Sequence, residues 1–205
     1  MPIEKKIIIF DLDGVLINSM NNMEIAWKYT SIKYGLKIKF EEYRKNIGLP
    51  FDTITKNLKI KNNRENIKES YSFYSKKYFN KIRLYPNVKG VLQYLRKKKY
   101  IIALITSKDK IRTKKIISLF NLKFKYIFTP NNSIKPKPYP HQINKIIQLE
   151  KVKKKNCYYV GDMNIDAKFA SNAGVNFIFT SYGFEKKKVK SKLNISNIKQ
   201  LKNIF

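Results

Sequence analysis

Five short runs of consecutive apolar residues occur along the chain, and polar residues follow most of them. The runs cover 7–10, 101–105, 126–129, 157–160 and 177–179. Continuous apolar runs of this length are typical of strands that are buried on both faces of a parallel sheet. Helical spacing of apolar residues fills the intervals at 88–98, 111–120, 140–149 and 166–173. This alternation predicts an α/β fold with a Rossmann-like, doubly wound parallel sheet.

The segment between the first and second of these strands breaks the alternation. Residues 18–82 show helical spacing without a convincing strand, and turn signals interrupt them at Gly35, at Gly48 to Pro50, and at Asn62 and Asn63. We therefore expect an α-helical domain inserted into the sheet domain. The expected division is an α/β core of residues 1–15 and 83–205, with a helical domain of residues 16–82.

Length and composition support a folded α/β protein. The chain has 205 residues, 43% of them hydrophobic and 14% aromatic, which is too apolar for a disordered protein. Cys157 is the single cysteine, so an intrachain disulfide framework is excluded. No apolar run approaches the roughly 18 residues of a membrane span, and no secretory signal is recognisable. A cytoplasmic location is expected.

The charge is strongly basic, because 44 Lys and Arg face 14 Asp and Glu and give a formal charge of +30. Two explanations stay open. Lys, Ile and Asn all have A/T-only codons, so an AT-rich genome produces this composition without selection. Alternatively, the charge attracts anionic substrates or nucleic acid. The lysine clusters at 97–99, 153–155 and 186–188 do not interleave with aromatic residues along one face. Nucleic acid is therefore not expected as a partner.

Polar clusters follow the predicted strands, at the sheet edge where open α/β proteins bind ligands. There are four of them: Asp11-Leu12-Asp13-Gly14, Thr106-Ser107, Lys135-Pro136-Lys137-Pro138, and Gly161-Asp162 with Asp166. Taken singly, each has a plain alternative as a strand exit, a helix cap, a solvated basic loop or a helix start. Acidic pairs at two neighbouring strand ends also suit a divalent cation.

In order and spacing, the four clusters resemble the motifs of the haloacid dehalogenase-like hydrolase superfamily. Those motifs are DxDG followed by T or V, then T or S, then K beside P, then GDxxxD. The segments Tyr85-Pro86-Asn87-Val88 and Ala170 to Gly174 resemble the branch that contains phosphoglycolate phosphatase and beta-phosphoglucomutase. The helical insert matches the cap domain of that branch.

The resemblance implies a role for each motif residue. Asp11 would be the nucleophile that forms an aspartyl-phosphate, and Asp13 would be the general acid and then the general base. The transferring phosphoryl group would be bound by Thr106, Ser107 and Lys135. A Mg²⁺ ion would be held by Asp11, the backbone carbonyl of Asp13, Asp162 and Asp166, with Asp166 as an outer or additional ligand.

These assignments imply a Mg²⁺-dependent phosphatase acting on a small phosphorylated metabolite of the phosphoglycolate, sugar-phosphate or nucleotide type. The expected state is a monomer or dimer without a membrane partner. Asp13 argues against a dehalogenase, whose motif lacks this acid. A phosphosugar mutase is the alternative enzyme, but its phosphate-binding cap arginine corresponds here to Phe51, although Arg44 could compensate. Asn18 replaces an aspartate usual in this branch. A basic nucleic-acid-associated protein on the same scaffold is the alternative from another class.

Overall fold

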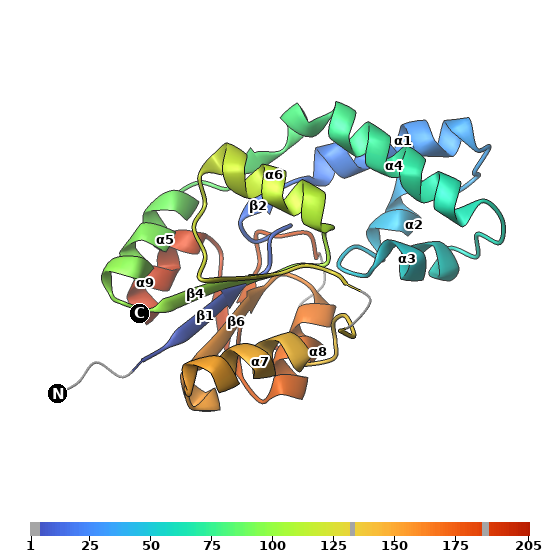
Figure 1. Ribbon diagram of the computed structural model, residues 1–205. Helices are drawn as coiled ribbons and strands as arrows, with labels where there is room; N and C mark the ends of the chain where they lie inside the picture. Colours follow the sequence, from blue (N-terminus) through green and yellow to red (C-terminus); the bar gives the residue numbers. More distant parts are fainter. Residues whose placement is uncertain (1–4, 132–133, 186–188) are drawn as a thin grey trace. The chain divides into compact units, whose positions relative to one another are not determined.

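The computed structural model describes residues 5–131, 134–185 and 189–205, and the lysines at 186–188 therefore lie outside the described residues (Figure 1). The chain divides into two compact units. The first runs to Ile17 and resumes from Leu84 to Phe205, and the second is Asn18–Arg83. These borders lie close to those expected from the sequence. The roles of the two units as catalytic core and cap stay a prediction.

A parallel sheet forms the centre of the first unit, with six strands among the described residues. The strand order is β5-β4-β1-β6-β7-β8, and neighbouring strands are parallel throughout. The strands are β1 Ile7–Phe10, β4 Ile101–Ile105, β5 Tyr126–Phe128, β6 Cys157–Gly161, β7 Asn176–Thr180 and β8 Leu193–Ile195. The predicted α/β class with a parallel sheet is confirmed. Five of the strands were expected, and β8 was not.

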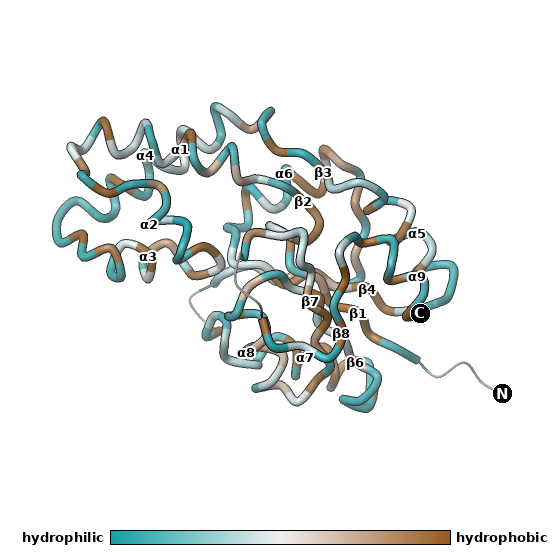
Figure 2. The backbone as a smooth tube through the Cα atoms, turned by 180° about the vertical axis from the view of Figure 1, so that it is seen from behind, coloured by the Kyte–Doolittle hydropathy of each residue, from teal (hydrophilic) through white to brown (hydrophobic). Residues whose placement is uncertain are grey.

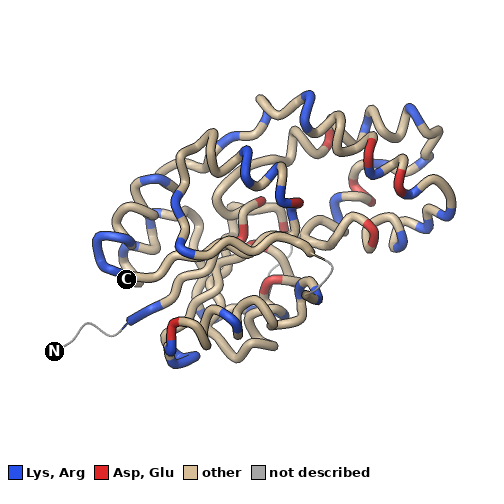
Figure 3. The backbone as a smooth tube through the Cα atoms, viewed as in Figure 1, with Lys and Arg blue, Asp and Glu red and all other residues tan. Residues whose placement is uncertain are grey.

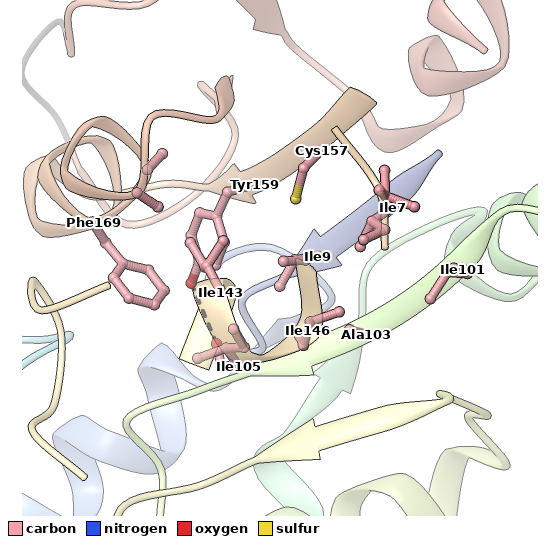
Figure 4. Close-up of a cluster of buried hydrophobic side chains, with 13 residues drawn as sticks. Ile7, Ile9, Ile101, Ala103, Ile105, Ile143, Ile146, Cys157, Tyr159 and Phe169 are labelled. Carbon is pink, nitrogen blue, oxygen red and sulfur yellow. Dashed lines mark hydrogen bonds between the residues drawn. The ribbon is translucent and has the colours of Figure 1, made fainter. Parts of the chain in front are cut away.

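One face of this sheet is covered by α7 (His141–Glu150) and α8 (Asn164–Ala173). Successive side chains of a strand point to opposite faces, so Ile7 and Ile9 of β1 lie on the face beneath these helices. They pack in one buried cluster with residues of β4, β6, α7 and α8 (Figure 4). The hydroxyl of Tyr159 donates a hydrogen bond of 3.3 Å to the carbonyl of Ile105 within this cluster, which satisfies a polar group in an apolar setting.

The other face of the sheet is covered by α5 (Val88–Lys97), α6 (Lys110–Phe120) and the short α9 (Leu201–Ile204) (Figure 1). The buried residues of α5 are Val88, Val91, Leu92 and Leu95, the spacing of one helical stripe. Figure 2 shows the strands of this unit as mostly hydrophobic. With helices on both faces, the strands can be apolar throughout, which explains the continuous runs in the sequence.

The second unit is helical, as the insert was expected to be. It contains α1 (Met20–Lys33), α2 (Phe40–Arg44), α3 (Phe51–Asn57) and α4 (Arg64–Lys77). Trp27 lies in its core, where its ring is 4.6 Å from that of Tyr43 and its indole N–H donates to the carbonyl of Ile38. Two-residue strands, β2 (Ile17–Asn18) and β3 (Arg83–Leu84), pair where the chain passes between the units.

Figure 3 shows Lys and Arg at many positions along the chain in both units. Basic residues are therefore spread along the chain of each unit and not confined to one segment. Among the helices of the described residues, none has the length and apolar character needed to cross a membrane.

Candidate active site

The turn after β1 places two aspartates at the carboxyl edge of the sheet. The backbone N–H of Asp11 donates to the carbonyl of Val160 at 3.0 Å, which continues the strand pairing for one residue. The side chain of Leu12 is buried, whereas Asp11 and Asp13 on either side of it belong to the polar cluster. Oδ1 of Asp11 accepts a hydrogen bond of 2.8 Å from the N–H of Leu12. The backbone therefore fixes the orientation of Asp11.

Asp162, which follows β6, lies in a cradle built by two glycines. A Cβ at Gly14 would lie 2.0 Å from Oδ2 of Asp162, and a Cβ at Gly183 would lie 2.3 Å from its Cβ. Gly14 also has a φ of +78°, which disfavours any other residue. The N–H of Phe184 donates to Oδ2 of Asp162 at 2.6 Å. The Tyr182–Gly183–Phe184 segment after β7 therefore lies against Asp162 at the same sheet edge.

Asp166 combines the two roles that the sequence left open. Its Oδ2 accepts hydrogen bonds from the N–H groups of Asp162 at 3.2 Å and Met163 at 3.1 Å, so it caps the start of α8. Its Oδ1 accepts from the Lys137 ammonium at 2.9 Å and lies 3.3 Å from the Tyr159 hydroxyl, whose single hydrogen is shared between this oxygen and the carbonyl of Ile105. The helix cap therefore also holds a carboxylate within the polar cluster.

Three carboxylates meet at this edge. Asp11, Asp162 and Asp166 are buried, and one oxygen from each lies within 4.8 Å of the others. Burial raises the pKa of Asp11 to about 7, although Lys137 opposes the rise. Burial also raises the pKa of Asp162 well above its usual range, and Asp166 adds to the effect. Without a further cation, the cluster is costly to ionise.

The donor set fits a divalent cation. Oδ1 of Asp162 is buried and has no hydrogen-bond partner among the described residues, which is an unfavourable state for a carboxylate oxygen unless an ion coordinates it. Oxygen ligands of this kind are those that Mg²⁺ and Ca²⁺ prefer. The four carboxylates of Asp11, Asp13, Asp162 and Asp166 face two buried ammonium groups, Lys108 and Lys137, so the formal charge of the cluster is about −2. One divalent cation would neutralise it.

The lysine that the structure places beside Asp11 is Lys137, whereas the resemblance had assigned the phosphate-binding role to Lys135. The ammonium of Lys137 is 3.2 Å from Oδ1 of Asp11 and 2.9 Å from Oδ1 of Asp166, and its side chain is 3% exposed. Burial alone would lower the pKa of Lys137, but the charges of Asp11 and Asp166 outweigh burial and raise it. Lys135 is exposed, and its ammonium lies over the ring of Tyr139.

Both lysines of Lys-Pro-Lys-Pro precede a proline, so the local sequence does not distinguish them. Only the side chain of Lys137 enters the buried cluster. The carbonyl of Lys135 accepts a hydrogen bond of 3.2 Å from the side chain of Gln142 at the start of α7, which fixes this residue by its backbone. The next lysine of the motif then enters the buried cluster. The ammonium next to Asp11 therefore belongs to the second lysine of the motif, two residues after Lys135.

Thr106 and Ser107 follow β4 on the same sheet edge. Thr106 is buried, and its Oγ1 accepts a hydrogen bond of 3.2 Å from the N–H of Lys108. Ser107 is half-buried. The sequence analysis did not select Lys108, whose ammonium lies 3.2 Å from Oδ2 of Asp13. Its only sequence signal was its position directly after Thr-Ser, at an edge where other polar residues gather.

Comparisons with known proteins agree with this geometry. Residues 8–180 match the family model described as haloacid dehalogenase-like hydrolase. A protein of Caldanaerobacter subterraneus named "Putative pyrophosphatase PpaX" is 31% identical over 177 residues, covering 83% of this chain and 79% of that protein. A phosphoglycolate phosphatase of Aquifex aeolicus is 26% identical over 188 residues, with coverage of 88% and 87%.

A solved structure supports the fold. The crystal structure titled as a predicted phosphoglycolate phosphatase of Haemophilus somnus superimposes with a TM-score of 0.85 at 24% identity, covering 98% of this chain and 97% of that one. At this identity the likeness concerns the fold, including a helical insertion after the first strand.

Proposed function

The chain belongs to the haloacid dehalogenase-like hydrolase family as one of its phosphatases, and on this premise we propose that it hydrolyses a small phosphorylated metabolite through an aspartyl-phosphate on Asp11, with Mg²⁺ as its cation. Phosphoglycolate and pyrophosphate are the first substrates to consider, because they occur in the names of its relatives. Sugar phosphates and nucleotides are further candidates.

The observation that carries this proposal is the setting of Asp11. Its hydrogen bond and ion pair among the described residues both involve Oδ1, which leaves Oδ2 as the oxygen available for attack. Lys137 supplies a buried positive charge next to Asp11, and Asp162 contributes a buried oxygen without a hydrogen-bond partner among the described residues to the same cluster. A carboxylate held this way can act as a nucleophile toward an anionic phosphoryl group only where nearby cations offset the charge.

The reaction then has two balanced steps. In the first, Oδ2 of Asp11 attacks phosphorus, the bond to the ester oxygen breaks, and Asp13 gives its proton to that departing oxygen. In the second, water attacks phosphorus, Asp13 accepts the proton of the water, and the bond between phosphorus and Asp11 breaks. Inorganic phosphate leaves, and both aspartates return to their starting states.

The remaining residues bind and orient. We assign to Lys137 the phosphate-binding role that the sequence gave to Lys135, and Thr106 and Ser107 contribute hydroxyl groups at the same edge. Asp11, Asp162 and the backbone carbonyl of Asp13 would hold Mg²⁺, with Asp166 beside them. When bound, the ion offsets the charge that Asp11 and the phosphoryl group share.

The mutase alternative gains no support from the position of Phe51. Its ring packs 5.2 Å from that of Tyr71 within the helical unit, so it serves the core of that unit and offers no cation for a second phosphate. An enzyme that must retain a bisphosphate between two transfers needs such an anchor. Hydrolysis needs none, because the product leaves after each cycle.

A screen of phosphorylated metabolites with Mg²⁺ tests the proposal. We expect the protein to release inorganic phosphate from at least one of 2-phosphoglycolate, pyrophosphate, sugar phosphates and nucleotides. Release should stop with chelator and return with Mg²⁺. Release that persists in chelator would contradict the metal assignment. Isomerised sugar phosphate without free phosphate would favour the mutase, and salt-dependent DNA binding without phosphate release would favour the nucleic-acid alternative.

A further inference from the structure

Lys108 is a buried cation that the roles above leave unused. Its side chain is 3% exposed, and its ammonium lies 3.2 Å from Oδ2 of Asp13, whose side chain is 12% exposed. Burial lowers the pKa of Lys108, and the charge of Asp13 opposes this effect. An ammonium is rarely buried without a carboxylate partner, because its loss of hydration costs several kcal/mol. The ion pair is therefore a built feature of the site.

The backbone around Lys108 is fixed at both ends of the residue. Its N–H donates to Oγ1 of Thr106 at 3.2 Å, and its carbonyl accepts from the hydroxyl of Thr113 in α6 at 3.2 Å. Asp109 then caps α6 by accepting from the N–H of Arg112 at 2.9 Å. The loop after β4 is thus anchored to the strand on one side and to the helix on the other. It holds the ammonium at a defined place.

We propose that Lys108 is a positioning residue for Asp13, and that it holds this carboxyl group where it meets the oxygen of the leaving group. The inference rests on the proposed function, because it concerns the acid and base of that reaction. Proton transfer needs the donor and acceptor within hydrogen-bond reach, so a free rotation of the Asp13 side chain would reduce the rate. The Lys108 ammonium contacts Oδ2 of Asp13, and a carboxyl oxygen can accept this contact whether or not Asp13 carries its proton, so the rotation is restricted in both steps.

This role predicts a specific pattern of loss. The first step includes departure of the leaving group, and kcat/KM reports the reaction through this step. An alkyl phosphate needs its oxygen protonated, whereas 4-nitrophenyl phosphate releases a stable phenolate that needs little help from Asp13. Lys108→Met should therefore lower kcat/KM by about 10- to 100-fold for the alkyl phosphate and by less than about threefold for 4-nitrophenyl phosphate. Lys114→Met, at an exposed lysine of the α6 helix that follows Lys108, is the matched control and should change neither value.

A second comparison separates positioning from direct binding of substrate. If Lys108 acts through Asp13, its replacement adds little once the acid is gone. Asp13→Asn and the double variant with Lys108→Met should then have kcat/KM values within about threefold of each other. Circular dichroism and thermal unfolding of each variant show that the comparison concerns folded protein.

The outcomes distinguish this inference from the proposed function. Equal losses for both substrates, or a large further loss in the Asp13→Asn background, would overturn the positioning role while leaving the phosphatase assignment intact. A wild-type protein that releases no phosphate from either substrate would overturn the proposed function, and the inference would fall with it. Wild-type activity together with the leaving-group pattern supports both.

Discussion

Replacing the two lysines of the Lys-Pro-Lys-Pro motif one at a time tests the arrangement of the site. Lys137→Met removes a buried ammonium that lies 3.2 Å from Asp11 and 2.9 Å from Asp166. Lys135→Met removes an exposed one, two residues away. The two variants make the same chemical change in the same loop. Any difference between them therefore reports the surroundings of the side chain.

The structure sets the expected magnitude. Two unit charges about 3 Å apart attract by about 5 kcal/mol at an effective dielectric constant of about 20. Removing one partner of a buried pair costs about 3–5 kcal/mol in net stability, because the other charge stays buried. For a protein of this size that corresponds to a melting temperature lower by roughly 6–20 °C. Lys135→Met should change stability by less than about 0.5 kcal/mol.

Activity should follow the same division. A cation that offsets charge on the transferring phosphoryl group contributes about 10²- to 10³-fold to kcat, so Lys137→Met should lose that much. Lys135→Met should keep at least half of the wild-type rate. The assay is phosphate release with saturating Mg²⁺, alongside thermal unfolding of both variants. A Lys135→Met protein that loses activity, beside an active Lys137→Met protein, would refute the assignment of Lys137.

Three further changes test other parts of the molecule. Asp11→Asn should reduce phosphate release to background while the circular dichroism spectrum is unchanged. Gly183→Ala would bring a Cβ to 2.3 Å from that of Asp162, so half-maximal activity should need about 10- to 100-fold more Mg²⁺, measured by titration. Burial disfavours ionised Glu150, but hydrogen bonds from two lysines and a tyrosine outweigh it and lower its pKa to about 2. Because this pKa lies below the unfolded value of 4.5, the stabilisation is complete above about pH 4.5 and is lost as the pH falls toward 2. Glu150→Gln should therefore lower the unfolding free energy at pH 7, and urea titrations should show the difference from wild type shrinking below pH 4.5.

The central strands could be predicted from the sequence because their environment is uniform. β1 and β4 are buried on both faces, and the apolar runs 7–10 and 101–105 have the same bounds as these strands. β8 is three residues long and contains the exposed Asn194, so it gave no apolar run. β2 and β3 have two residues each, and such short strands depend on partners that are distant in sequence.

The sequence indicates which strand ends bring the aspartates together, but not which lysine of Lys-Pro-Lys-Pro lies beside Asp11. Asp11 and Asp162 each follow a strand directly, and the sheet brings them together. Lys135 and Lys137 share the same local sequence, and only the tertiary contacts with Asp11 and Asp166 separate them. Lys108 contacts Asp13, which is 95 residues away in sequence, and the N–H of Phe184 contacts Asp162, which is 22 residues away. Local pattern carries no information about such pairs.

The overall charge of the protein is a poor guide to its function, and the site explains why. The chain carries a formal charge of +30, yet three buried carboxylates lie together at the edge of its sheet. A scaffold that only bound anions would gain nothing from burying three carboxylates within 4.8 Å of one another, because each raises the cost of ionising the others. Such a cluster is useful when a cation joins it and when one of its members must attack an anion. The buried acids therefore favour catalysis on a phosphorylated substrate, and this argument does not depend on the origin of the lysine-rich composition.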